Sequence, residues 1–209
     1  MAFAATNAMA QTTNIAPTKP RPIAVPACVG WPGEGQFLGS GSNKGKSNLT
    51  WRYVDTNSTR PRWRFNYAYG VDDRLLVGLE YNPVVDEILP TINYTFNTGE
   101  DHGGYVISFG SSSDRIFSPD GTRSYFGTIA KGLPDLKISP YVSLLYSEWE
   151  DTFTVPFGLN WAFAPQWDAM VQNDGRNTHW LCTYKTEKAN FSFLLVKGRY
   201  PGFSLGYRF

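Results

Sequence analysis

The residues of this chain that could do catalytic chemistry are few. The sequence has two histidines, His102 and His179. Covalent catalysis needs a nucleophile, a base that activates it and a group that orients the base. His102 lies between Asp101 and Gly103 in an expected turn, whereas His179 follows Thr178 in an expected strand, and neither has a serine two positions away. We therefore predict no catalytic residues in this chain.

The two cysteines, Cys28 and Cys182, do not indicate a metal site either. Neither lies at ligand spacing from a second cysteine, a histidine or a carboxylate cluster, so we predict no metal and no cofactor. Two unrelated thiols are the simpler interpretation. A disulfide between them is the alternative, which an oxidising compartment would permit.

Charge and aromatic content narrow the class of protein. The 209 residues carry a formal net charge of +1, which gives no general electrostatic reason to bind nucleic acid. Aromatic residues make up 16% of the chain, a content that suits a barrel with aromatic girdles. No run approaches the ~20 apolar residues of a membrane-spanning helix. A helical membrane protein is therefore excluded, whereas a barrel is not, because its strands are apolar only at alternate positions.

From Leu49 onward the chain alternates between apolar and polar residues, with turn residues between the alternating segments. In 152–163, Phe, Val, Leu and Trp occupy every second position, with Thr, Pro, Gly, Asn and Ala between them. Successive side chains of a strand point to opposite faces, so each segment has one apolar face and one small or polar face. We predict strands at residues 49–56, 62–69, 74–82, 89–96, 104–111, 122–131, 136–147, 152–163, 166–172, 177–185, 189–196 and 202–209.

The last strand has the clearest meaning for the location of the protein. The chain ends FSLGYRF, with Phe203, Leu205, Tyr207 and Phe209 at alternate positions. It resembles the terminal strand of bacterial outer-membrane β-barrels, in which a final Phe and the hydrophobes before it are the signal read by the barrel-assembly machinery. The resemblance implies residence in the bacterial outer membrane, contact with its lipid and insertion by that machinery. It implies no substrate, and it leaves the oligomeric state open.

The expected fold is all-β: a transmembrane, antiparallel, up-and-down β-barrel of about twelve strands, with ten or eight as the alternatives. Such barrels keep long loops outside the cell and short turns in the periplasm. With the C-terminus in the periplasm, the long connection 111–121 falls outside, and the short connections 71–73, 164–165 and 186–188 fall inside. Pro140 and Pro156 lie within expected strands, where proline cannot donate a ladder hydrogen bond, so we expect a bulge or kink at each.

Charged residues on the polar faces of the strands are the candidates for a function in the lumen, because charge that faces lipid is costly. They are Arg52, Arg64, Glu80, Asp168, His179, Lys185 and Arg208. Arg64 and Glu80 lie on adjacent strands and could pair across the hairpin. Two interpretations stay open: a salt-bridge network that closes a narrow barrel, or a small pore whose selectivity these charges set. Outside the strands, Glu148, Glu150 and Asp151 form an acidic tip that a solvated hairpin loop explains.

The segments before the strands lack this alternation. Ala8-Met9-Ala10 before Gln11 fits a signal-peptide cleavage site, so residues 1–10 are expected to be the remnant of a signal peptide. Residues 11–47 are rich in Pro, Gly and polar residues and are expected to form a flexible leader. The barrel domain is then 48–209.

These expectations favour an outer-membrane barrel with a structural role or that of a narrow passive channel, and no enzymatic activity. One alternative is a soluble, secreted, lipocalin-like barrel that binds an apolar ligand, in which the apolar face of 152–163 would point inward. The other is an outer-membrane enzyme that acts on lipid and depends on His179.

Overall fold

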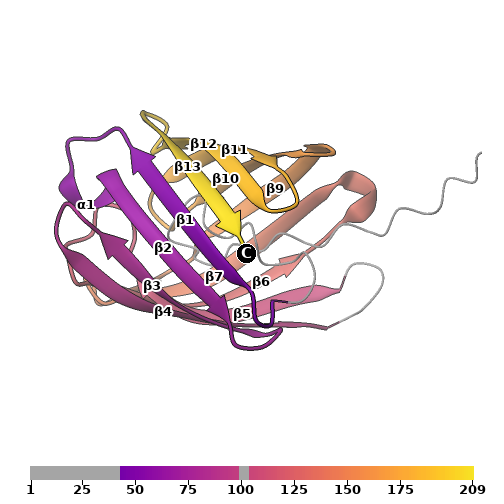
Figure 1. The fold of residues 1–209 in the computed structure, drawn as a ribbon, viewed down its shortest axis with the longest axis horizontal. Coiled ribbons are helices and arrows are strands. Elements are labelled where there is room, and N and C mark those ends of the chain that lie inside the picture. Colours follow the sequence, from indigo (N-terminus) through magenta and orange to yellow (C-terminus); the bar gives the residue numbers. More distant parts are fainter. Residues whose placement is uncertain (1–42, 99–103) are drawn as a thin grey trace, which may run out of the picture.

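The computed structural model describes residues 43–98 and 104–209, and this part of the chain is mostly β-strand (Figure 1). The expected signal-peptide remnant and nearly all of the expected leader lie outside the described residues, as do His102 and Cys28. A single turn of helix, α1 (Thr59–Arg62), and a 3₁₀ turn (Pro134–Leu136) interrupt the strands. The strands are β1 (Ser47–Val54), β2 (Trp63–Gly70), β3 (Leu75–Asn82), β4 (Glu87–Asn97), β5 (Tyr105–Ser113), β6 (Arg123–Lys131), β7 (Ile138–Ser147), β8 (Thr152–Thr154), β9 (Phe157–Ala164), β10 (Trp167–Asn173), β11 (Thr178–Lys185), β12 (Ala189–Val196) and β13 (Tyr200–Arg208).

The described strands close into an antiparallel barrel. Apart from β8 and β9, each strand pairs with the next along the chain, and β13 pairs back with β1 to complete the ring (Figure 1). Strands β8 and β9 both pair with β7, one after the other along its length, so the two count as one strand of the barrel wall. The barrel therefore has twelve strands. The predicted fold class and the predicted number of strands are confirmed.

The expected bulges at the two prolines are absent. Leu145 pairs with Thr154, and Val142 pairs with Phe157. Two residues lie between these pairs on each side, so Pro156 adds no extra residue to its strand. The Pro156 carbonyl still accepts a hydrogen bond from Ser143 N, at 2.8 Å, and only the reciprocal bond is missing. The lost donor interrupts the ladder without changing its register, so no bulge forms, and the strand is divided at Pro156 into β8 and β9.

Pro140 avoids a bulge for a different reason. It pairs in register with Leu159 of β9, and it lies one residue beyond the last pair between β6 and β7, Ala130 with Tyr141. Backbone N–H groups alternate between the two sides of a strand, so the donor that Pro140 lacks faces β6, beyond the last pair of the β6–β7 ladder. The one irregularity in the registers of the described strands lies instead beside Asp168, where β9 carries an extra residue opposite β10.

The two faces of the barrel wall differ in polarity. Large apolar side chains lie exposed on the outer face, for example Phe153 at 64% and Trp161 at 50% exposure. The polar residues between them are mostly buried on the inner face, as are Ser143, Asn160 and Thr183. The apolar face of 152–163 therefore points outward, which is the arrangement of a barrel in lipid. This contradicts the lipocalin-like alternative, which needed that face to line the interior.

The closing seam between β1 and β13 is well built. Ser47 and Phe209 exchange two backbone hydrogen bonds, of 2.9 and 3.0 Å, so the final residue takes part in the ladder. On the outer face, Trp51 stacks on Trp63 of β2 with centroids 5.6 Å apart, and it meets Phe203 of β13 edge-on at 5.2 Å. Such aromatic pairs across strands add stability beyond the area that they bury.

The connections divide between the two ends of the barrel. The end at Phe209, here called the terminal end, carries the short turns 71–74, 165–166 and 186–188. The opposite end, here called the loop end, carries α1 and the connections 83–86, 114–122, 148–151, 174–177 and 197–199. The long connection and the short turns thus fall at opposite ends, as predicted. Among the described residues no helix is long and apolar enough to cross a membrane.

Candidate functional site: the lumen and the loop that enters it

The charged residues predicted to face the lumen all lie on the inner face of the wall. Lys185 is half-buried, and the others are buried: Arg52, Arg64, Glu80, Asp168, His179 and Arg208. Each charged residue lies an even number of positions from polar residues of its own strand, so its side chain points to the same inner face as theirs. They do not form one cluster, since they are spread over six strands and along the length of the barrel.

The inner wall formed by β1, β2 and β3 carries three of these charged side chains, Arg52, Arg64 and Glu80. Arg52 lies opposite Arg64 in the ladder on one side and opposite Ser204 on the other. Arg64 forms an ion pair with Glu80 of β3, which is the cross-hairpin pair that the sequence predicted. All three charged side chains are almost fully buried, and a buried ion pair holds its charges in place through a low local dielectric.

Two further contacts lie nearer the terminal end. Lys185 of β11 pairs with Asp168 of β10, which lies opposite the extra residue of β9. Arg208, next to the last residue, donates a hydrogen bond to the Asn43 side-chain oxygen at 2.7 Å. This bond joins the end of the last strand to the chain just before the first strand, so it supports the closing seam from inside.

Several polar side chains of the inner face have no hydrogen-bond partner among the described protein atoms. Both side-chain polar atoms of Asn93 are in this position, as are the hydroxyls of Ser108 and Ser204 and the amide oxygens of Asn160 and Asn190. Buried polar atoms in native proteins are almost always satisfied, by protein groups or by ordered water. These inner-face groups therefore keep hydrogen-bonding capacity that the described protein atoms do not use.

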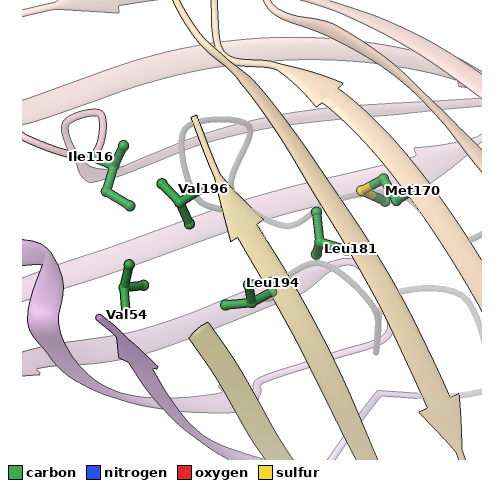
Figure 2. Close-up of a cluster of buried hydrophobic side chains, with 6 residues drawn as sticks. All are labelled: Val54, Ile116, Met170, Leu181, Leu194 and Val196. Carbon is green, nitrogen blue, oxygen red and sulfur yellow. The ribbon is translucent and has the colours of Figure 1, made fainter. Parts of the chain in front are cut away.

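The connection between β5 and β6, residues 114–122, folds into the loop end of the lumen; we call it the lumen loop. Its residue Ile116 is only 3% exposed and packs in an apolar cluster with Val54, Met170, Leu181, Leu194 and Val196. Figure 2 shows Ile116 reaching from its loop toward Val196 and Val54. Strands β10, β11 and β12, which carry most of this cluster, lie across the barrel from β5 and β6 in the strand order. The lumen loop therefore spans the barrel interior.

The second half of the lumen loop is held by one arginine and one glutamate. Arg60 of α1 donates to the Ser118 carbonyl at 3.1 Å and to the Thr122 carbonyl at 3.2 Å. Glu87, at the start of β4, accepts from Arg60 Nε at 3.0 Å and also from the backbone N–H of Gly121. Arg60 and Glu87 are both buried, so this latch is rigid and shielded from salt.

The first half is held by the neighbouring turn between β7 and β8. Arg115 pairs with Glu150 of the 148–151 turn, and Glu150 also accepts from Arg176 at 2.8 Å. Asp114 accepts a hydrogen bond from the Ser147 hydroxyl. The partial burial of Glu150 opposes its ionisation, but the hydrogen bonds from Arg115 and Arg176 outweigh this and hold its pKa below the usual value. Glu150 is therefore a latch residue, which corrects the prediction that a solvated tip explains it.

Phe117 takes a backbone conformation that bulky residues rarely adopt, with φ of 73°. Its ring lies 5.5 Å from the ring of Tyr200, and the Lys197 ammonium lies 3.9 Å from its centroid. Tertiary contacts must support such a conformation, which costs on the order of 1–3 kcal/mol. The left-handed conformation of Phe117 thus depends on its contacts with the β12–β13 turn.

His179 is fully buried at the loop end, and both of its ring nitrogens are occupied. Its Nε2 lies 3.0 Å from Asp174 Oδ2, and its Nδ1 accepts from Lys197 N at 3.4 Å. Burial opposes ionisation of Asp174, but hydrogen bonds from His179 and from two backbone N–H groups hold its pKa below the usual value. This dyad joins the 174–177 and 197–199 turns. Among the described residues, no hydroxyl or thiol is hydrogen-bonded to this dyad. The enzyme alternative, which depended on His179, therefore lacks a nucleophile beside it.

The described residues provide no metal site and no disulfide. They contain no group of three His, Cys, Asp or Glu side chains that could hold a metal ion. Cys182 is a free thiol on the outer face of β11, opposite Ala169 and Phe193. Its predicted partner in the alternative disulfide, Cys28, lies outside the described part of the chain.

Sequence analysis missed the lumen loop, its two latches and the apolar cluster that receives Ile116. Some signal was present: the run Leu194-Leu195-Val196 breaks the alternation of β12, and Ile116-Phe117 is an apolar pair inside an otherwise polar connection. Arg60, Glu87 and Arg115 lie in or beside turns, where charged residues are ordinary. Only the fold brings them together.

Comparison with known proteins supports the fold and not an activity. No protein family and no curated protein matches the sequence. Among solved structures, the KdgM porin matches with a TM-score of 0.51 over 78% of this chain and 98% of that chain, at 9% identity. Ail, the attachment invasion locus protein of Yersinia pestis, matches over 79% of this chain and 99% of that one at 11% identity, but its TM-score of 0.14 carries no argument. The fold and its outward apolar face thus define the class: the chain has the closed antiparallel barrel fold of bacterial outer-membrane proteins.

Proposed function

We propose that this protein is a narrow passive channel of the bacterial outer membrane. The observation that carries the proposal is the polarity of the inner wall. Charged, amide and hydroxyl side chains line it along its length, and several buried amide and hydroxyl groups have no hydrogen-bond partner among the described protein atoms. A polar inner wall of this kind suits passage of small polar solutes.

Twelve strands favour a narrow channel. Barrel diameter grows with strand number, so that about eight strands leave room only for packed side chains, whereas sixteen to eighteen leave a wide aqueous channel. The lumen loop narrows the loop end further. Likeness of fold to a protein named as a porin, KdgM, is consistent with the proposal. Under it the terminal end faces the periplasm and the loop end faces the exterior.

The test uses the buried pair Arg64–Glu80 on the lumen wall. Removing a negative charge from a pore raises its preference for anions, and removing a positive charge raises its preference for cations. We expect Glu80→Gln and Arg64→Gln to shift the reversal potential in a salt gradient in opposite directions. A change of about 1 kcal/mol in ion energy gives a roughly fivefold change in permeability ratio.

The control is Glu187→Gln, which removes a carboxylate from an exposed turn at the terminal end. Its reversal potential should equal that of the wild-type protein. Heat-dependent gel mobility verifies that each variant is folded. Shifts of the same sign in Glu80→Gln and Arg64→Gln, or channels with no shift in either variant, would refute a conduction path along this wall.

A further inference from the structure

The lumen loop has three separate attachments, and each joins it to a different part of the loop-end rim. Arg60 and Glu87 hold residues 118–122, and Glu150 holds Arg115. The third attachment is apolar, where Ile116 packs against the far wall. An ordinary surface loop needs none of these. Three attachments from three sides indicate a segment whose position inside the barrel matters.

The inner face carries two apolar clusters. One, formed by Val106, Phe126, Ala130, Tyr141 and Leu145, lies on β5, β6 and β7, the wall from which the lumen loop departs. The cluster that receives Ile116 lies on the opposite wall. Val54, Met170, Leu181, Leu194 and Val196 project inward from four strands, where the neighbouring inward positions carry polar residues. Apolar side chains in a water-filled lumen lose free energy unless something covers them. Ile116 covers them, and Phe117 and Tyr200 pack against the same cluster. We call the cluster the seat of the lumen loop.

Each of the two polar latches depends on the negative charge of one carboxylate. Glu87 links Arg60 to the Gly121 backbone, and Glu150 links Arg115 to Arg176. Without those charges Arg60 loses its carboxylate partner, and Arg115 and Arg176 lose the carboxylate that they share. The charged groups that contact the loop or its latches are Arg60, Glu87, Asp114, Arg115, Glu150, Arg176 and Lys197, and the nearby dyad adds Asp174 and His179.

We propose that the lumen loop is a gate, seated by Ile116 and latched shut by Glu87 and Glu150, and that loss of the two carboxylate charges releases it. The proposal rests on the proposed channel function for its consequence, because release widens the conduction path. The movement of the loop itself does not depend on conduction and can be measured separately.

Accessibility of position 116 measures the movement. In a Cys28→Ser, Cys182→Ser background, Ile116→Cys places one thiol in the seat, and a maleimide coupled to polyethylene glycol reports its exposure as a gel shift. At neutral pH we expect slow modification with Glu87 and Glu150 intact. The Glu87→Gln, Glu150→Gln double variant should react roughly tenfold faster, which corresponds to a latch contribution of about 1.4 kcal/mol. Working at one pH avoids any change in the reactivity of the thiol itself.

Two controls accompany this experiment. Asp120→Cys, on the exposed side of the same loop, should react fast in every background. The Glu148→Gln, Glu187→Gln double variant removes two exposed carboxylates and should leave the rate at position 116 unchanged. Single-channel conductance is recorded on the same proteins.

The outcomes separate the gate from the channel. Faster modification together with larger conductance in the double variant supports both. An unchanged rate at position 116 overturns the gate, whatever the conductance. Faster modification in a protein that conducts in no variant supports the moving loop and overturns the channel. An equal acceleration in the Glu148→Gln, Glu187→Gln control would also overturn the latch, since it would make the effect one of general charge.

Discussion

At the scale of single residues, ion pairs and hydrogen bonds hold the side chains of the inner wall in position. Alternation along the strands was enough to place Arg52, Arg64 and Glu80 inside, because a side chain's face is set by its phase in the strand. It was not enough to find the partners of Glu150 or Asp174. Those partners come from turns that are distant in sequence, and only the closed barrel sets their distances.

Glu150 makes the contribution of one latch to stability dependent on pH. Its folded-state pKa lies below the ordinary value of 4.5, so it adds stability above that value and loses it as the pH falls through the folded pKa. We expect Glu150→Gln to lower the midpoint of thermal unfolding at neutral pH. The difference from the wild-type protein should shrink to nothing well below pH 4.5.

Circular dichroism or heat-dependent gel mobility across a pH series measures these midpoints in detergent. Glu187→Gln serves as the matched variant, since its carboxylate is exposed at the other end of the barrel. A Glu150→Gln defect of equal size at all pH values would show that the substitution acts through packing and not through charge.

At the scale of elements, β13 closes the barrel, and its last residue belongs to the ladder. Phe209 bonds to Ser47 through the backbone while its ring lies 62% exposed on the outer face. The sequence predicted this strand well because its pattern is strictly periodic. It did not predict the course of 114–122, because a connection has no period and its position depends on what the opposite wall offers.

The proposed role of the terminal strand in assembly predicts a specific defect. Phe209→Ser should sharply reduce the amount of protein in the outer membrane, whereas Phe157→Ser should reduce it far less. Phe157 is the matched control because it is similarly exposed, at 56%, on the same outer face. Quantification of the heat-modifiable form in outer-membrane fractions measures both. Equal losses would indicate a general need for outer-face aromatics and contradict a terminal signal.

At the scale of the whole molecule, the inverted polarity of the barrel, with apolar side chains outside and polar side chains inside, explains most of the composition. A barrel with its apolar face outward needs many apolar and aromatic residues at alternate positions of its strands, and the residues between them give it a mostly polar interior. Strand number and the sidedness of the loops followed from periodicity and turn length. The absence of bulges at Pro140 and Pro156 did not, because register is a property of two strands together and not of the strand that carries the proline.

The most direct test of the central claim is single-channel recording of the purified full chain in planar lipid bilayers. A narrow water-filled barrel predicts discrete conductance steps, smaller than those of sixteen-stranded porins. Ile116→Asp, which places a charge in the apolar seat, should give larger steps. Folded protein that inserts yet gives no steps, in the wild type and in Ile116→Asp alike, would contradict the channel and leave a closed barrel.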